Sequence, residues 1–127
     1  MREIKFKAKT CNSEWVEGLL AHKDNKWYIS NKVGMPFAFE VRPETISQYI
    51  GLNDKNGKEI YEGDIVKCNY NYYGDKGTYI GKVIFREDTC MFLITDTKST
   101  NYEWWNEDKV VVGNIFDNPE LLERGAE

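Results

Sequence analysis

Side chains that could carry out nucleophilic, acid–base or metal chemistry are few in this chain. The sequence contains one histidine and three cysteines, and the cysteines are too widely spaced to form a CxxC pair. The histidine, His22, lies between Ala21 and Lys23 in a polar stretch that is typical of an exposed turn, so a Cys/His nucleophilic pair is not expected. A zinc site would require scattered ligands to meet in space without any of the usual ligand spacings. We therefore predict no catalytic residues, no metal site and no cofactor.

Three carboxylates, Glu59, Glu62 and Asp64, lie close together in the sequence. Neighbouring carboxylates can act as a general acid–base pair when their surroundings shift one pKa away from the other. Carboxylates beside a glycine turn, however, are more often surface groups that keep a hairpin soluble. We therefore favour a structural role for this cluster over a catalytic one.

The segment Asp54–Gly57 resembles part of a calcium-binding loop. When Gly57 is aligned with the glycine of such a loop, Leu52 and Gly63 fall where the first and the last ligands must be, so both of those ligands are missing. Asn56 and Gly57 are instead residues that tolerate positive φ angles well, which predicts a type I′ hairpin turn. We expect the chain to double back here.

Tyrosines and basic residues gather between positions 70 and 86. In a small barrel, rings on the loop after the first strand can stack on nucleobases or pack against a protein. The same rings could cover a subunit interface or cap the core. Residues 51–127 carry nine Lys and Arg against fifteen Asp and Glu, a net charge of −6, which repels a phosphate backbone unless the charges are segregated. The candidate binding surface consists of Tyr70, Tyr72, Tyr73, Lys76, Tyr79, Lys82 and Arg86.

Length and composition indicate one compact unit or two small subdomains. The chain has 127 residues, of which 41% are apolar and 30% charged, and this is enough to bury a core without disulfides or metals. The formal charge of −4 argues against a general polyanion binder. Residues 1–50 carry eight Lys and Arg against six Asp and Glu, a net charge of +2. Opposite charges on the two halves could attract one another between subunits, and a solvated surface is the alternative.

The sequence also predicts a compartment. It contains no apolar run long enough to span a bilayer, and its N-terminus alternates charged with apolar residues, unlike a signal peptide. An odd number of widely spaced cysteines suits reduced, buried thiols better than a disulfide framework. We expect no membrane contact and a cytoplasmic location.

Alternating polarity predicts an N-terminal β region. Ile4, Phe6 and Ala8 alternate with three lysines, which places the lysines on the opposite face of a half-buried strand. The polar residues 23–25 supply turn chemistry for a hairpin, and Pro43 ends a later strand because it offers no N–H to a ladder. Strands are expected at residues 4–8, 15–21, 26–30 and 37–41. Residues 45–49 fit either a short strand or a single helical turn.

The second part of the chain is expected to form a small barrel. Gly63-Asp64 precedes a β-branched pair, a common start of the first strand in SH3-like barrels. The polar stretch at residues 70–78 predicts a loop or an extended hairpin tip. Residues 118–122 carry the start signals of a short helix, namely a capping side chain, a proline and an acidic residue. Strands are expected at residues 65–69, 79–86, 90–94 and 110–116.

Four blocks of sequence resemble the YopX proteins of bacteriophages and prophages. They occur in the order found in that family and span nearly the whole chain, whereas residues 10–41 match no pattern of the family. The resemblance implies a mostly β cytoplasmic phage protein with a C-terminal barrel-like domain. It implies no established activity, and hence no catalytic residues to transfer. The four blocks are residues 1–8, 48–67, 81–85 and 113–122.

The residues and the resemblance lead to one set of expectations. The fold is mainly β, with an N-terminal antiparallel β region at residues 1–49 and a C-terminal small SH3-like β-barrel at residues 50–127 that ends in a short helical turn. The function is that of a non-enzymatic phage accessory protein that binds a host or phage protein or associates with itself as a homo-oligomer. The alternative is a nucleic-acid-binding module that uses the Tyr70–Tyr79 segment.

Overall fold

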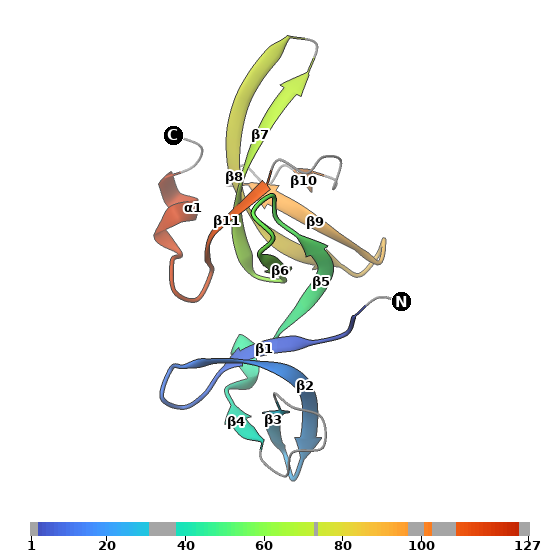
Figure 1. The fold of residues 1–127 in the computed structure, drawn as a ribbon, viewed down its shortest axis with the longest axis vertical. Coiled ribbons are helices and arrows are strands. Elements are labelled where there is room, and N and C mark those ends of the chain that lie inside the picture. Colours follow the sequence, from blue (N-terminus) through green and yellow to red (C-terminus); the bar gives the residue numbers. More distant parts are fainter. Residues whose placement is uncertain (1–2, 31–37, 73, 97–100, 103–108, 125–127) are drawn as a thin grey trace. The chain divides into compact units, whose positions relative to one another are not determined.

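The computed structural model describes residues 3–30, 38–72, 74–96, 101–102 and 109–124 (Figure 1). The described chain is mainly β, with two antiparallel sheets, a 3-10 turn and a short helix. Its contacts divide it into two compact units, Met1–Gly51 (unit 1) and Leu52–Glu127 (unit 2). Among the described residues, no helix has both the length and the apolar character needed to cross a membrane.

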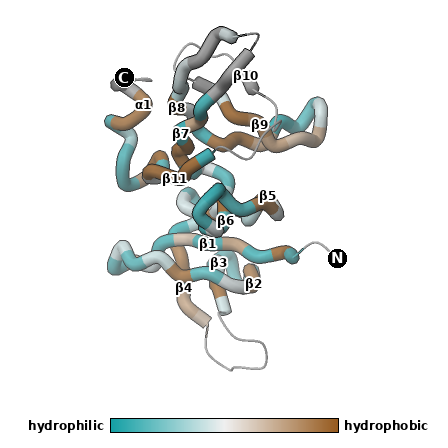
Figure 2. The backbone as a smooth tube through the Cα atoms, turned by 45° about the horizontal axis from the view of Figure 1, so that its top comes forward, coloured by the Kyte–Doolittle hydropathy of each residue, from teal (hydrophilic) through white to brown (hydrophobic). Residues whose placement is uncertain are grey.

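The first sheet has the strand order β4-β3-β2-β1-β5-β6. Unit 1 contains β4, β3, β2, β1 and most of β5. Ala8 in β1 is fully buried, while Lys7 and Lys9 on either side of it are half-buried on the opposite face. The predicted alternation is therefore confirmed at residues 7–9, and Figure 2 shows it as changing colour along β1. Ile4, which was predicted on the buried face, lies before β1 and is 63% exposed. The core is made by Ala8, Ile29 and Val41. The elements are β1 (Phe6–Lys9), β2 (Trp15–Lys23), β3 (Lys26–Ser30), β4 (Phe39–Val41), the 3-10 turn η1 (Pro43–Thr45) and β5 (Ser47–Asn53).

The predicted hairpin between residues 15 and 30 is present. β2 and β3 pair antiparallel up to Lys23 opposite Lys26. The two residues between them, Asp24 and Asn25, have φ angles of +53° and +64°. Positive φ at both central positions is the signature of a type I′ turn, and aspartate and asparagine tolerate it better than most residues.

Of residues 45–49, for which the sequence allowed a short strand or a helical turn, Ser47 to Tyr49 belong to strand β5, and Thr45 ends the preceding 3-10 turn η1. η1 begins at Pro43. Proline suits this position because the N–H of a first helical residue makes no hydrogen bond within the helix, and proline has no N–H. Thr45 then ties η1 to β1: its Oγ1 accepts a hydrogen bond from the Lys9 N–H at 2.8 Å and donates one to the Arg42 carbonyl at 2.7 Å. β5 begins two residues later, at Ser47.

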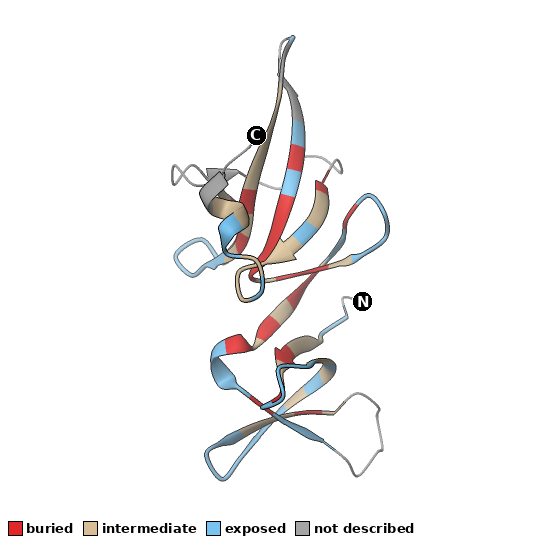
Figure 3. Cartoon of the chain, turned by 90° about the vertical axis from the view of Figure 1, so that its left-hand side faces the viewer, coloured by how far each residue is buried: buried red, intermediate tan, exposed pale blue. Residues whose placement is uncertain are grey.

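Unit 2 contains a five-stranded antiparallel sheet with the order β10-β9-β8-β7-β11. Buried Val66 and Cys68 alternate with exposed Lys67 and Asn69 along β7, as Figure 3 shows. Within the described residues the two outer strands of this order, β10 and β11, do not pair, so the closed SH3-like barrel that we expected is not found there. The elements are β6 (Glu59–Tyr61), β7 (Asp64–Tyr72), β8 (Asp75–Arg86), β9 (Met91–Asp96), β10 (Asn101–Tyr102), β11 (Lys109–Asn114) and α1 (Glu120–Arg124).

The hairpin between β5 and β6 is present, but the type I′ prediction is wrong. Gly57 has a positive φ of +85°, whereas Asn56 does not. The Gly57 N–H donates to the Asp54 carbonyl at 3.0 Å, and the Asp54 N–H donates to the Lys58 carbonyl at 2.8 Å. This is the pattern of a type I turn followed by a left-handed glycine. The Asp54 carboxylate favours it by accepting the N–H groups of Asn56 and Lys58, each at 2.9 Å.

The last strand ends at Asn114, two residues earlier than predicted. Its side-chain Oδ1 accepts the N–H groups of Phe116 at 3.0 Å and of Asp117 at 2.9 Å, which turns the chain out of the sheet. Gly113 lies at a bulge in the pairing of β11 with β7. A Cβ atom there would lie 2.5 Å from Oδ1 of Asn118, so the turn requires glycine at this position. The predicted helix follows as α1.

Candidate functional site

The seven residues of the predicted binding surface are only partly described. Tyr73 lies outside the described residues. Tyr70, Tyr72 and Lys76 are described by their backbones alone. The first two lie at the end of β7, opposite Gly77 and Asp75, and Lys76 lies near the start of β8. The expected loop is therefore the tip of a long hairpin, which was one of the two structures that the sequence allowed.

The other three residues of that surface do not share a face. Tyr79 lies opposite Cys68 and Lys82 lies opposite Ile65, three positions further along β8. Because side chains alternate along a strand, an odd separation places Tyr79 on the opposite face from Lys82 and Arg86. Arg86 instead forms an ion pair with Asp88, with 2.8 Å between Nε and Oδ1. Tyr79 therefore does not share a face of β8 with Lys82 and Arg86, and the candidate binding surface as a whole stays a prediction.

The hairpin formed by β7 and β8 extends beyond the rest of its sheet. Among the described residues, β11 pairs with β7 at residues 64–68, and β9 pairs with β8 at residues 81–86. Beyond those pairs, β7 and β8 continue together through four more rungs, from Asn69 opposite Thr78 to Tyr72 opposite Asp75. We call residues 69–78 the β7–β8 arm. Figure 1 shows the two strands running on past β9 and β11. Among the described residues, no strand pairs with either outer edge of this arm.

The carboxylate cluster has a structural arrangement. Asp64 is only 1% exposed, and its Oδ2 accepts the N–H of Tyr61 at 2.9 Å, which closes the turn between β6 and β7. The Tyr61 hydroxyl reaches Oε1 of Glu59 at 3.4 Å. Burial raises the pKa of Glu62, the carboxylate between them. These contacts favour the structural interpretation, in which the cluster shapes the start of β7.

Asp54 is a structural residue whose full role the sequence did not reveal. Besides holding its own turn, its Oδ2 accepts the N–H of Val111 in β11 at 3.0 Å. The carboxylate is 7% exposed. Burial acts to raise the pKa of Asp54, but the N–H donors of Val111, Lys58 and Asn56 and the nearby Lys58 charge outweigh it and hold the pKa below its usual value. An aspartate before a turn is visible in a sequence, whereas a partner 57 residues away is not.

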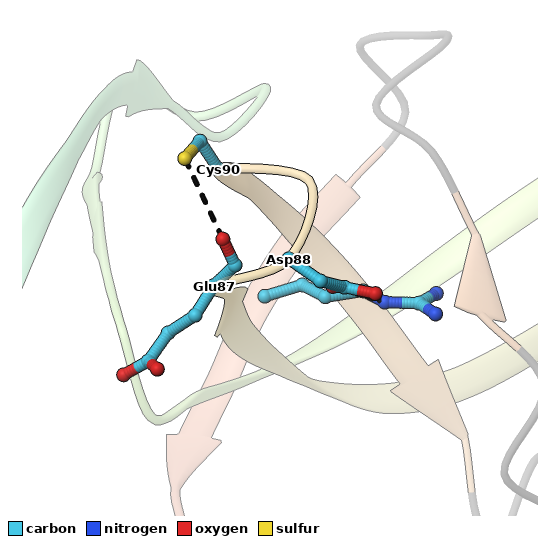
Figure 4. A network of polar contacts seen from close by, with 4 residues as sticks. Glu87, Asp88 and Cys90 are labelled. Atoms are coloured by element: carbon cyan, nitrogen blue, oxygen red, sulfur yellow. Dashed lines mark hydrogen bonds and ion pairs between the residues drawn. The ribbon is translucent and has the colours of Figure 1, made fainter.

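The three cysteines are free thiols, but only one of them is buried as predicted. Cys68 is 1% exposed and lies opposite Tyr79 on one side and Lys109 on the other. Burial raises the pKa of Cys68, and a hydrogen bond with Tyr79 and the Lys109 charge partly offset this effect. Cys11 and Cys90 are exposed. The Cys90 thiol lies 3.5 Å from the Glu87 carbonyl in the turn between β8 and β9. Figure 4 marks this contact with a dashed line.

His22 has no cysteine next to it in the sequence, and the residue opposite it in β3 is Trp27. It is exposed in β2 and stacks on Trp27 with 4.2 Å between the ring centroids. Within the described part of the chain, no group of three His, Cys, Asp or Glu side chains is arranged to hold a metal ion.

Unit 1 contains a cavity that our sequence analysis missed. Its volume is about 680 Å³, and it opens where β2 leaves β1 after Gly18 to pair with β3 from Leu19 onward. Lys7 and Lys9 lie beside it with their ammonium groups 4.9 Å and 5.4 Å from the Trp15 ring centroid. The alternation of lysines was visible in the sequence, but the position of Trp15 depends on the register of β2. The lining includes Ile4, Lys5, Lys7, Trp15, Glu17 and Leu19.

Comparisons with known proteins agree with this architecture. The crystal structure of protein EF1440 from Enterococcus faecalis matches with a TM-score of 0.57 and 23% identity, over 96% of this chain and 99% of that one. At this level of identity the likeness shows a shared fold alone. A comparison with curated proteins gives no match. The family model described as YopX protein matches residues 2–123, nearly the whole length. The chain belongs to the YopX family.

Proposed function

We propose that this chain is a non-enzymatic β module of a phage or prophage that acts in the bacterial cytoplasm by binding protein. In this proposal unit 2 has an SH3-like barrel fold. Its partner is a second copy of the same chain, and the contact is made by the β7–β8 arm. The observation that carries the proposal is the pair of outer arm edges that no strand covers among the described residues.

An uncovered strand edge is a template for pairing. Each edge presents backbone N–H and C=O groups to any extended chain that approaches it. Natural proteins usually protect such an edge with proline or a covering segment, or keep it very short. The arm contains no proline and adds four rungs beyond the sheet. A two-stranded ribbon is at best marginally stable alone in water, so strand addition from a partner would stabilise it.

A second copy is the partner that this geometry favours. Antiparallel pairing of the same edge in two chains places residue i of one copy opposite residue j of the other, and residue j opposite residue i, which gives a closed two-fold dimer and leaves no growing edge at that contact. The other outcome is that a host or phage protein, and not a second copy, adds a strand to the arm. The experiment below must distinguish these two outcomes.

Nucleic-acid binding by the Tyr70–Tyr79 segment is the weaker alternative. Residues 51–127 have a net charge of −6. Unit 2 begins one residue later, at Leu52, and has the same charge because Gly51 is uncharged. Two cations of the candidate surface, Lys82 and Arg86, lie on the opposite face of β8 from Tyr79. A phosphate backbone would thus meet an acidic unit without an adjacent row of cations.

Removal of the arm tests the proposal. Cys68 and Tyr79 lie directly opposite each other, so residues 69–78 can be replaced by Asn-Gly as a two-residue turn. In reducing buffer at tens of micromolar, we expect the wild type to have a dimer mass by multi-angle light scattering and the shortened variant to have a monomer mass. Cooperative melting of the variant shows that it is folded, and Cys90→Ser serves as a control far from the arm. A monomeric wild type, or a shortened variant that still dimerises, contradicts the proposal.

A further inference from the structure

A row of lysines in unit 1 forms a surface that the proposed function does not use. Lys7 and Lys9 lie on one face of β1, and Lys5 continues the same two-residue spacing directly before the strand. Side chains two residues apart on a strand are about 6.8 Å apart. Lys9 lies opposite Trp15 on β2, and Lys7 lies opposite Glu17. We call Lys5, Lys7, Lys9 and Trp15 the lysine face.

The lysine face combines cations with aromatic rings. The ammonium groups of Lys7 and Lys9 both lie within 5.4 Å of the Trp15 ring centroid, and that of Lys5 lies 5.5 Å from the Tyr49 ring centroid. An aromatic ring attracts an ammonium group through its quadrupole but carries no net charge, so the lysine stays positively charged beside it. The strand geometry thus presents a line of positive charge beside the Trp15 indole.

The charges of the chain are segregated by unit. Unit 1 has a formal charge of +2, with eight Lys and Arg against six Asp and Glu, whereas unit 2 has a charge of −6. A polyanion is therefore repelled least at unit 1. Two acidic side chains, Glu3 and Glu17, also lie near the face, with Glu3 at 3.5 Å from Lys5. They limit the affinity for a polyanion, whereas the contacts of the lysines with phosphates make the binding sensitive to salt.

The cavity beside the lysine face has the size and lining of a ligand site. Its volume of about 680 Å³ falls within the range of small-molecule pockets. Its walls combine Trp15 with the aliphatic side chains of Ile4 and Leu19, which are 63% and 49% exposed. Such walls suit a flat, uncharged group that is covalently joined to an anion.

We propose that the lysine face of unit 1 binds single-stranded nucleic acid. The Lys7 and Lys9 ammonium groups turn from the Trp15 ring to contact successive phosphates, and a base that enters the cavity takes their place over the ring. Proteins that bind single strands without sequence preference combine a positive track for the backbone with aromatic side chains for the bases. The lysine face has both, whereas the described part of the β7–β8 arm does not bring them together.

Fluorescence anisotropy of a labelled oligothymidylate, titrated with the full-length protein at 20–50 mM salt, tests this assignment directly. We expect the Lys7→Gln/Lys9→Gln variant to bind at least tenfold more weakly, and its salt dependence, as the slope of log affinity against log salt, to fall by about 1.4 because two phosphate contacts are lost. Trp15→Leu should weaken binding about tenfold. The matched control is Lys23→Gln/Lys26→Gln, which removes the same charge from the hairpin tip of the same unit and should change the affinity less than twofold.

Several results would overturn the assignment. One is the absence of binding by the wild type at 100 μM protein. Another is a loss of affinity in the control variant as large as that in Lys7→Gln/Lys9→Gln. Loss of binding in the arm-shortened protein alone would place the site in unit 2. Competition by polyglutamate as strong as that by unlabelled oligonucleotide of equal charge would show a general polyanion surface. Melting curves of each variant separate loss of binding from loss of folding, and if Trp15→Leu unfolds, the lysine variants decide.

Discussion

Asp54 is expected to be among the most sensitive positions in unit 2, and Asp54→Ala measures how strongly its carboxylate joins the β5–β6 turn to β11. The substitution removes three charge-assisted hydrogen bonds, to Asn56 and Lys58 at 2.9 Å and to Val111 at 3.0 Å. The first two N–H groups lie in an exposed turn where water replaces the carboxylate, so each costs about 0.5–1 kcal/mol. The Val111 N–H is half-buried, and its loss costs about 1–2 kcal/mol. We expect the free energy of unfolding to fall by about 2–4 kcal/mol.

Urea unfolding followed by circular dichroism gives this difference from the shift in midpoint. Asp88→Ala is the control, because its carboxylate also pairs at 2.8 Å but is 64% exposed, and such pairs contribute about 0–1 kcal/mol. A destabilisation by Asp54→Ala no larger than that of the control would refute the reasoning, since it would mean that β11 does not depend on the carboxylate.

The pH dependence of stability provides a second readout of the same carboxylate. The native pKa of Asp54 is lowered from its ordinary value of 3.8, so the folded state binds a proton more weakly than the unfolded state. Its stabilising contribution is complete well above pH 3.8 and is lost as the pH falls from there through the native pKa. Asp54→Asn should therefore lose less stability than the wild type between pH 5 and pH 2. Parallel curves for the two proteins would contradict the assignment.

Two further predictions concern the turn and the thiols. Gly57→Ala should destabilise the chain by about 1 kcal/mol, because φ is +85° while an added Cβ meets nothing within 4 Å; urea unfolding measures this, and an unchanged midpoint would argue against the left-handed glycine. Under native conditions a thiol reagent should modify Cys11 and Cys90 quickly and Cys68 only after unfolding, because Cys68 is 1% exposed and burial raises its pKa. Mass spectrometry of the labelled peptides identifies the sites, and rapid modification of Cys68 would contradict its placement in the core.

Local pattern was sufficient for the first strands of unit 1. The alternation of Ala8 with lysines predicted the buried face of β1, and the polar residues 23–25 predicted the β2–β3 turn. Both features depend on neighbours in sequence, where the period of side chains and the φ preferences of turn residues act directly.

Contacts between distant residues explain what the sequence could not predict. The turn at Asp54 differs from type I′ because its carboxylate binds backbone N–H groups on both sides of the turn and on β11. The lysine face became visible only through the register that places Trp15 opposite Lys9. Conversely, Tyr79 and Lys82 are close in sequence but lie on opposite faces of β8, so closeness along the chain suggested a shared surface that the strand separates.

The central claim is that a second copy of the chain pairs with the β7–β8 arm, and hydrogen–deuterium exchange of the arm's backbone amides tests it most directly. Peptides covering residues 69–72 and 75–80 should exchange more slowly at high protein concentration than at low concentration, because strand pairing engages the outward-facing N–H groups only in the dimer. Peptides from β2 and β3 serve as the internal reference and should be unaffected by concentration. Fast exchange throughout the arm that does not change between 1 and 100 μM protein would contradict the claim.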